Sequence, residues 1–302
     1  MGSDASELPE KDHGSAAPTR DLVGDANRLA ALSLVREGTL YDLDCGRWPG
    51  MPGGGVHPPF QVIAYRTPRG MHNQKDQAWL RQDEVNLGLH TEVLIASVHT
   101  GTHIDALSHV TTGQDDHWFD GAHAESDYGD FGPLKYDATS IPPLITRGVL
   151  IDVAGERGVM ALEAETPICA TDLESALAAQ GTSLRAGNVA LIRTGYLGVW
   201  PDIQSKAHKG AGITLDAAEF LMEAGCVAVG SDTEALEQFP SPDPRDPLPV
   251  HVRMLAERGV YILEMVYCED LARDKVYEFC FISLPLKIRG ATGSFLRPVA
   301  LV

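Results

Sequence analysis

Apolar residues gather in six runs along the chain from residue 90 onward. The runs are short and rich in β-branched side chains, and polar or glycine-containing segments separate them. Runs of this kind are typical of strands that are buried on both faces. The predicted strands are VLIASV (93–98), GVLIDV (148–153), NVALIRTG (188–195), CVAVGSD (226–232), VYILEMV (260–266) and EFCFISLPLKI (278–288).

Three segments between these runs have the spacing of amphipathic helices. TDLESALAAQG opens with a Thr171-x-x-Glu174 capping box and stops at Gly181. LDAAEFLMEAG and VHVRMLAERG follow the same scheme and end at Gly225 and Gly259. Strands that alternate with helices favour an α/β fold with some parallel pairing. We therefore predict an α/β domain in which helices flank a mixed central β-sheet.

The N-terminal part of the chain shows neither periodicity. Residues 1–25 are polar and predict a disordered tail, which leaves residues 26–302 as one folded domain. No internal repeat and no further linker divides that domain.

The segment DCGRWPGMPGGGVHPPF is rich in proline and glycine and predicts an extended loop. No GK[ST] and no helical pattern follow its glycines, so a phosphate-binding loop is excluded. A structured loop that carries Trp48, His57, Pro58 and Phe60 as the wall of a pocket fits this composition better.

Charge and hydropathy narrow the range of partners. The chain has 24 basic and 42 acidic residues, for a net charge of −18. This charge repels nucleic acid and anionic lipid. No apolar run approaches the roughly 20 residues that span a bilayer, and the N-terminal sequence lacks the blocks of a secretory signal. We expect a cytoplasmic protein that binds neither nucleic acid nor membrane.

The cysteines argue against a disulfide framework. Their number is odd, no CxxC pair occurs, and most lie in apolar surroundings, which predicts reduced and buried thiols. They are Cys45, Cys169, Cys226, Cys268 and Cys280.

The segment HTGTHIDALSH (99–109) concentrates ligands that Zn²⁺, Mn²⁺ and Fe²⁺ prefer. In an extended strand, His99 and His103 would lie about 13 Å apart at ~3.3 Å per residue. Ligand atoms on one ion must approach within roughly 3–4 Å of each other. The chain must therefore bend between the two histidines, and Gly101 suits such a bend.

Two further residues of this segment have candidate roles. Asp105 could be a third ligand, binding one ion or bridging two. His109 could be another ligand. Because three protein ligands leave a position open for water, His109 could instead carry protons, a role that suits its usual pKa near ~6.5.

HTGTHIDALSH resembles the HxGTHxDxPxH signature of the metal-dependent cyclase family, which includes kynurenine formamidases, isatin hydrolases and related γ-lactamases. Leu107 replaces the usual proline. The resemblance extends from about Asp42 to about Leu271, through IPPLITRGVLIDVA, NVALIRTGY, GCVAVGSDTEALEQFP and PVHVRMLAERGVYILEMV. It implies the single-domain cyclase fold, of swivelling β/β/α type.

The resemblance also implies roles for individual residues. His99, His103 and Asp105 would be metal ligands, and His109 would be the catalytic acid and base. His251 and Glu264 are the candidates for a second ion. The alternatives are a histidine that merely begins a helix and a buried glutamate satisfied by a basic neighbour.

The family further implies a cofactor, an oligomer and a reaction. The cofactor would be Mn²⁺ or Zn²⁺, between which the ligand types do not decide, and the protein would be a homodimer or homotetramer. The reaction would be the hydrolysis of a cyclic amide, of isatin or γ-lactam type, by metal-activated water. Candidate contacts to the ring are Trp48, Phe60, Trp118 and Phe119.

Two alternatives remain open at this point. One is an arylformamidase acting on acyclic amides such as N-formylkynurenine, and the other is a non-catalytic protein with a structural ion. Three other enzyme classes are not supported, because GxSxG, HExxH and GxGxxG motifs are absent in the required contexts.

Overall fold

A mixed nine-stranded sheet is the centre of the computed structural model, which describes residues 22–53, 56–80, 82–201 and 209–302. Its strands are β1 (Leu40–Asp42), β4 (His103–Asp105), β7 (Leu144–Asp152), β9 (Val189–Arg193), β11 (Ala228–Ser231), β12 (Tyr261–Glu264), β13 (Glu278–Ser283), β14 (Gly293–Phe295) and β15 (Val299–Leu301). The spatial order is β1-β15-β13-β7-β9-β11-β12-β4-β14.

Three two-stranded sheets accompany the central sheet in the described part of the chain. They pair β2 (Gln61–Arg66) with β3 (Thr91–Ile95), β5 (Tyr128–Gly129) with β6 (Gly132–Pro133), and β8 (Pro167–Ile168) with β10 (Gly212–Ile213).

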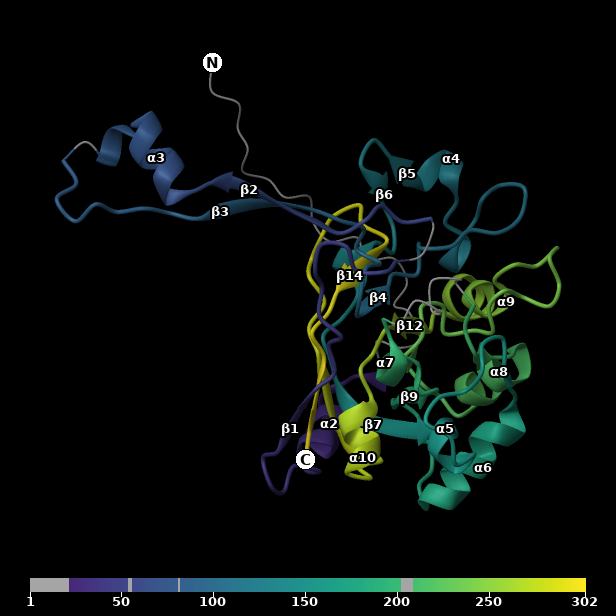
Figure 1. Cartoon of the computed structure of the whole chain (residues 1–302). Coiled ribbons are helices and arrows are strands. Elements are labelled where there is room, and N and C mark those ends of the chain that lie inside the picture. The colour runs from purple at the N-terminus through teal and green to yellow at the C-terminus, as the bar shows by residue number, and fades with distance from the viewer. Residues whose placement is uncertain (1–21, 54–55, 81, 202–208) are drawn as a thin grey trace.

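The helices α6, α8 and α9 lie together to the right of the central sheet in Figure 1, whereas α3 lies apart from it. The α-helices are α2 (Asp25–Leu32), α3 (Pro68–Gln74), α4 (Ala124–Asp127), α5 (Val153–Glu156), α6 (Ala170–Gln180), α7 (Tyr196–Val199), α8 (Leu215–Glu223), α9 (Pro249–His251) and α10 (Glu269–Arg273). The 3₁₀ turns are η1 (Ala78–Leu80), η2 (Phe119–Gly121) and η3 (Ala138–Ser140), and the π-helix η5 (Val252–Arg258) continues α9. Within the described ranges, no helix combines the length and the apolarity that a bilayer crossing needs.

The middle of the sheet is parallel and fully buried. β7, β9, β11 and β12 run parallel to one another, and Val149, Leu150 and Ile151 of β7 have no exposed surface. Continuous apolar runs are expected where both faces of a strand are covered. Antiparallel strands flank this centre on both sides, so the predicted mixed α/β sheet is confirmed.

The predicted strand 93–98 lies elsewhere than the central sheet. β3 ends at Ile95 and pairs with β2 in a hairpin, which extends away from the body together with α3 and η1 (Figure 1). The strand that follows β3 and does belong to the central sheet is the short β4, which the sequence pattern did not predict.

Two predicted element ends are also wrong. The strand predicted over 278–288 ends at Ser283, shortly before Pro285, whose nitrogen cannot donate to a sheet ladder. The capping box of α6 does not begin at Thr171. The backbone nitrogen of Cys169 donates to the Asp172 carboxylate over 2.8 Å, and the helix does end at Gly181 with positive φ.

The predicted tail and the predicted thiols can be compared with the structure in part. Residues 1–21 lie outside the described residues, whereas Val23 is 3% exposed and packs in the core. The last residues of the predicted tail therefore belong to the folded domain. All five cysteines are free thiols, and Cys226, Cys268 and Cys280 are buried.

Gly148 provides a test of how tightly the middle of the sheet is packed. It pairs with Phe279 of β13, and a methyl group at Gly148 would lie 2.2 Å from the Phe279 ring. We expect Gly148→Ala to lower the free energy of unfolding by about 1–3 kcal/mol, as overpacking does, measured by urea denaturation. The Gly148→Ala/Phe279→Leu variant should recover part of the loss, and additive losses would contradict this packing explanation.

Candidate metal centre

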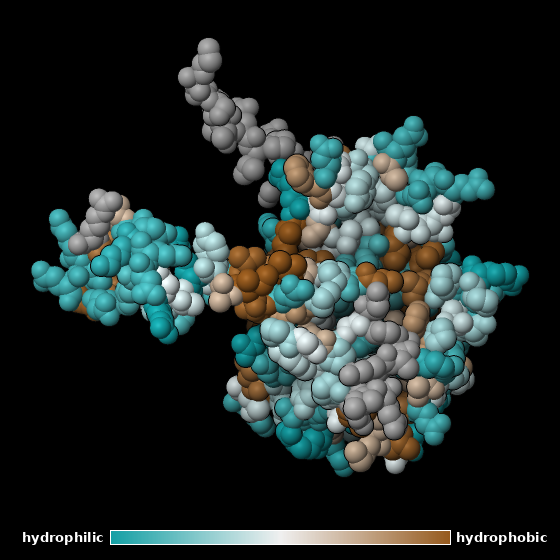
Figure 2. Space-filling view, turned by 45° about the horizontal axis from the view of Figure 1, so that its top comes forward, coloured by the Kyte–Doolittle hydropathy of each residue, from teal (hydrophilic) through white to brown (hydrophobic). Residues whose placement is uncertain are grey.

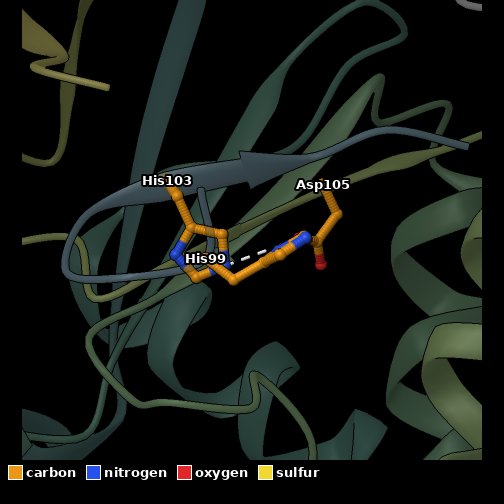
Figure 3. A group of neighbouring side chains, drawn as sticks. All are labelled: His99, His103 and Asp105. Atoms are coloured by element: carbon orange, nitrogen blue, oxygen red, sulfur yellow. Dashed lines mark hydrogen bonds and ion pairs between the residues drawn. The ribbon is translucent and has the colours of Figure 1, made fainter. Parts of the chain in front are cut away.

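The predicted bend between His99 and His103 is present. The chain turns at Gly101, whose φ is +63°, and re-enters the central sheet as β4. His103 and Asp105 are two residues apart on this strand, so their side chains point to the same face (Figure 3). Ile104 points the other way into the core and is fully buried. The prediction of a bend is confirmed.

Arg47 holds this turn in place from the loop before the arm, which is the protruding hairpin of residues 61–95 that contains β2, α3, η1 and β3. Its Nε donates to the carbonyl oxygen of Thr100 over 2.8 Å, and its Nη2 donates to the carbonyl oxygen of Thr102. A side chain at Gly101 would approach Arg47 Cγ to 3.0 Å. The hydroxyl of Thr102 donates to the carbonyl oxygen of Met265, just beyond β12. The turn is thus tied to two distant segments.

The three residues predicted as ligands come together around the Asp105 carboxylate. His99 Nδ1 lies 2.8 Å from Asp105 Oδ1, and His103 Nε2 lies 3.4 Å from the same oxygen. One ligand atom from each of the three residues lies within 4.8 Å of the others. Figure 3 shows both imidazoles turned toward the carboxylate.

The other nitrogen of each of these imidazoles has a partner in the protein. His99 Nε2 lies 2.9 Å from the hydroxyl oxygen of Thr292. His103 Nδ1 lies 2.7 Å from the carbonyl oxygen of Gly101. Such outer partners fix the ring orientation and the tautomer of metal-binding histidines.

His251 and Glu264 form a second group with Asp105. His251 Nε2 lies 3.2 Å from Glu264 Oε1 and 3.8 Å from Asp105 Oδ2. Its Nδ1 faces Glu237 Oε1 at 2.6 Å. Glu264 also approaches His103, with 3.3 Å between Oε2 and Nε2. The structure therefore brings all five residues predicted as ligands into one cluster, with Asp105 common to both groups.

β4 explains how Glu264 reaches this cluster. β4 pairs with β12 in antiparallel register, which sets His103 directly opposite Glu264. On its other side β4 pairs with β14, where Gly293 stands opposite Asp105. A methyl group at Gly293 would lie 2.7 Å from His99 Cε1. Glycine at this position therefore leaves room for the His99 ring.

Burial and charge act against each other on the buried groups. Burial lowers the pKa of His103, but the carboxylates of Asp105 and Glu264, 3.4 and 3.3 Å from its Nε2, outweigh burial and raise this pKa to about 10. Burial raises the pKa of Asp105, but the surrounding imidazoles hold it well below its usual range. The pKa of Glu264 is lowered because His103 and His251 outweigh its burial.

The same competition operates at His251. Burial lowers its pKa, but Glu237 and Glu264 outweigh this effect and raise the pKa of His251 well above its usual range. The Glu237 carboxylate also accepts hydrogen bonds from the backbone nitrogens of Val250 and His251, at 3.2 and 2.9 Å. Sequence reasoning missed Glu237, although it lies within GCVAVGSDTEALEQFP.

His109 stacks on His99, with 3.9 Å between the ring centroids. Burial is the main reason that its pKa falls to about 4, and the charge of Asp105 opposes the fall. His109 is therefore a neutral imidazole at neutral pH. His57 also stacks beside this pair, with 5.1 Å between its ring centroid and that of His99 and 6.5 Å to that of His109.

A cavity of about 180 Å³ opens onto this cluster. Part of its wall is apolar and comes from Met51, Pro58, Pro59, Phe60 and Met265. The predicted pocket wall is therefore present for His57, Pro58 and Phe60, whereas Trp48 is not part of it.

The remaining aromatic candidates have other surroundings. Trp48 packs against Trp200, with 5.1 Å between ring centroids. Trp118 and Phe119 are buried in the hydrophobic core. Glu234 adds a carboxylate to the cavity wall. This carboxylate accepts a hydrogen bond from the Tyr196 hydroxyl at 3.2 Å.

Comparison with known structures gives similar folds over almost the whole chain. A crystal structure of a novel cyclase is 26% identical and covers 95% of this chain and 96% of its own, with a TM-score of 0.83. Isatin hydrolase A from Labrenzia aggregata, bound to benzyl benzoate, is 20% identical, with a TM-score of 0.63 and coverage of 92% and 99%. A predicted metal-dependent hydrolase from Bacillus stearothermophilus is 16% identical, with a TM-score of 0.54 and coverage of 88% and 98%.

Sequence comparison agrees with the fold. No protein among the curated sequences matches the chain significantly. The Cyclase family model, described as "Putative cyclase", matches residues 46–238, which is more than half of the chain and includes the turn, β4 and Glu237. The chain therefore belongs to the Cyclase family.

Proposed function

We propose that this protein is a metal-dependent hydrolase that opens a cyclic amide of the isatin or γ-lactam class. The observation that carries the proposal is the arrangement around Asp105. Three histidines each have one nitrogen held by a protein partner and the other directed toward a carboxylate. The isatin hydrolases and the metal-dependent hydrolase among the similar folds support this proposal.

Two buried polar atoms test whether these residues suit a metal ion. His103 Nε2 and Asp105 Oδ2 are buried and make no hydrogen bond of acceptable geometry. Unsatisfied buried polar groups are costly and rare. Both atoms face the centre of the cluster, and imidazole nitrogen and carboxylate oxygen are ligands that divalent metals prefer. The donor set therefore fits a divalent ion.

We assign the first ion position to His99, His103 and Asp105, and a second to Asp105, His251 and Glu264. Either Mn²⁺ or Zn²⁺ suits these nitrogen and oxygen donors. A divalent ion at this place supplies a Lewis acid that polarises an amide carbonyl and acidifies water.

His109 is the residue that we assign to proton transfer. Its neutral imidazole can accept a proton from water and return it to the departing nitrogen. Stacking on His99 places the His109 ring beside the first ligand group. Among the described contacts, no carboxylate lies within hydrogen-bond distance of His109. In a cyclic substrate this nitrogen stays attached to the product after the ring opens.

The cavity wall supports a small, largely apolar substrate. Phe60, the two prolines before it and Met265 offer flat and apolar contacts to a ring. Glu234 offers a carboxylate to a hydrogen-bond donor on the substrate. The competing functions are the hydrolysis of an acyclic formamide and a non-catalytic protein whose ion is structural.

Metal analysis combined with a substrate panel tests the proposal. The purified protein is loaded with Mn²⁺ or Zn²⁺ and assayed on isatin, small γ-lactams and N-formylkynurenine. Turnover of isatin or a lactam is the expected result. Preference for N-formylkynurenine would favour the formamidase, and bound metal without any turnover would favour a structural ion.

Single substitutions at the cluster separate ligands from the proton carrier. His99→Ala, His103→Ala and Asp105→Ala should each lose metal and activity together. His109→Ala should keep its metal while turnover falls about 10²–10⁴-fold, the usual contribution of a general acid–base residue. Elemental analysis and steady-state rates measure both properties. His57→Ala is the comparison variant, and a larger loss there than in His109→Ala would move the proton-transfer role to His57.

Metal binding should be coupled to the release of protons. The pKa of His103 is raised to about 10 and that of His251 is also raised, so both imidazoles are in their charged, doubly protonated form at neutral pH in the metal-free protein. A ligand nitrogen must lose its proton, and affinity should therefore rise as the pH increases toward 10. Calorimetric titration in buffers of different ionisation enthalpy measures the protons released. A binding enthalpy that does not depend on the buffer would contradict this coupling.

Glu237→Gln tests the outer partner of His251. Loss of the carboxylate should leave the fold intact but lower metal affinity about 10–100-fold, as loss of such partners does elsewhere. Glu219→Gln is a matched control, because Glu219 pairs with Arg253 on the helix that follows His251. Competition with a chelator measures affinity, and equal affinities in the two variants would show that Glu237 does not orient His251.

A further inference from the structure

His57 is the histidine of the cavity wall that belongs to neither ligand group. It lies shortly before the arm in the sequence, and Ser97 lies shortly after it, so the two residues flank the base of the arm. Figure 2 shows hydrophobic surface where the arm joins the body. In apolar surroundings a hydrogen bond between side chains is stronger than in water, so a contact between His57 and Ser97 can fix the imidazole.

Two contacts of the Ser97 hydroxyl bear on which His57 nitrogen carries the proton. The backbone nitrogen of His99 donates to Ser97 Oγ over 3.2 Å. The same oxygen lies 3.2 Å from His57 Nδ1. A hydroxyl that accepts one hydrogen bond still has its own proton to donate. If this proton goes to Nδ1, the neutral imidazole carries its own proton on Nε2, because only one of the two nitrogens is then protonated.

The remaining surface of the His57 ring leaves Nε2 for the cavity. One face of the ring stacks on His99, with 5.1 Å between the centroids and 21° between the planes. Nδ1 faces Ser97. Among the described residues, none forms a hydrogen bond with His57 Nε2, although His57 is part of the cavity wall. The Nε2 edge is therefore the polar part of the ring that a bound molecule can meet.

We propose that His57 is a substrate-binding donor and that Ser97 is the residue that positions it. Ser97 donates to Nδ1, and the Nε2–H of His57 donates to an oxygen of the substrate. Because His57 stacks on His99, this oxygen lies next to the substrate group that faces the ligand cluster. The choice of substrate rests on the proposed function. It favours a ring amide that carries a second acceptor oxygen beside the scissile carbonyl.

Nitrogen-15 NMR of labelled histidine side chains tests the tautomer without reference to activity. Spectra are recorded at neutral pH with and without added Zn²⁺, and the His57 signals are identified by their loss in His57→Gln. We expect a neutral ring with its proton on Nε2. Ser97→Ala should move the Nδ1 resonance downfield, because it removes the hydrogen bond that Nδ1 accepts, and Ser97→Thr should restore it. A ring protonated on Nδ1, a charged ring, or an unmoved resonance in Ser97→Ala would overturn the proposal.

A pair of related ligands tests the donor itself. Isatin and oxindole share a fused lactam ring, but oxindole lacks the ketone oxygen beside the amide carbonyl. Calorimetry on the Zn²⁺-loaded protein gives both affinities. His57→Asn should lower the ratio of isatin to oxindole affinity by about 3–10-fold, as the loss of one hydrogen bond does. His57→Gln should keep this ratio, because the glutamine amide nitrogen takes the place of Nε2 and the asparagine nitrogen that of Nδ1.

These two variants also separate a donor from a proton carrier, since glutamine donates hydrogen bonds but does not titrate. A ratio that falls equally in both, a ratio that falls in neither, or a wild type that binds neither compound would overturn the donor role. Ser126→Ala is the matched control, because Ser126 Oγ faces His123 Nε2 at 3.3 Å and neither residue lines the cavity. It should leave the affinity ratio and the His57 resonances unchanged.

Turnover of isatin and oxindole, measured in parallel, decides the reaction separately. A wild type that binds both compounds with the expected response to His57→Asn, but converts neither, would reject the proposed hydrolysis and keep His57 as the donor. A wild type that hydrolyses isatin, with a ratio of affinities that His57→Asn does not change, would keep the hydrolysis and reject the donor.

Discussion

The buried Asp105 carboxylate is the constraint on which the site depends. A carboxylate at 0% exposure needs compensation, and here imidazoles supply it from two sides. Each of these imidazoles is in turn held through its second nitrogen, His99 by Thr292 and His251 by Glu237. Because these contacts fix the orientation of the imidazole rings, the nitrogens that face Asp105 stay directed toward one centre.

The fold produces this arrangement through one short strand. β4 lies between β12 and β14, and both pairings are antiparallel. The first pairing sets Glu264 opposite His103, and the second sets a glycine opposite Asp105, where any larger residue would meet the His99 ring. Residues from three distant parts of the sequence therefore meet because of sheet register. A shift by one residue would turn His103 and Asp105 toward the core.

Local chemistry made part of this predictable from the sequence. The need for a bend at Gly101 follows from the reach of two imidazoles, and the buried parallel strands follow from continuous apolar runs. β4 escaped prediction because a three-residue strand of His, Ile and Asp has no clear β signal. Glu237 escaped it because its role comes from contact with His251, fourteen positions away in sequence. The arm was not predicted because VLIASV has the composition of a core strand. Its place outside the core becomes visible only in the structure, where β3 pairs with β2 in an exposed hairpin.

The arm and the metal centre are joined by the chain itself. The cavity wall at His57 and Phe60 runs directly into β2, and β3 leads through Ser97 into His99. The Ser97 hydroxyl and His57 Nδ1 lie 3.2 Å apart, which closes the base of the arm across these two segments. A displacement of the arm at its base must therefore move the cavity wall and the first ligand together. Contacts that fix the arm thus also restrict the position of His99, although they lie outside the site.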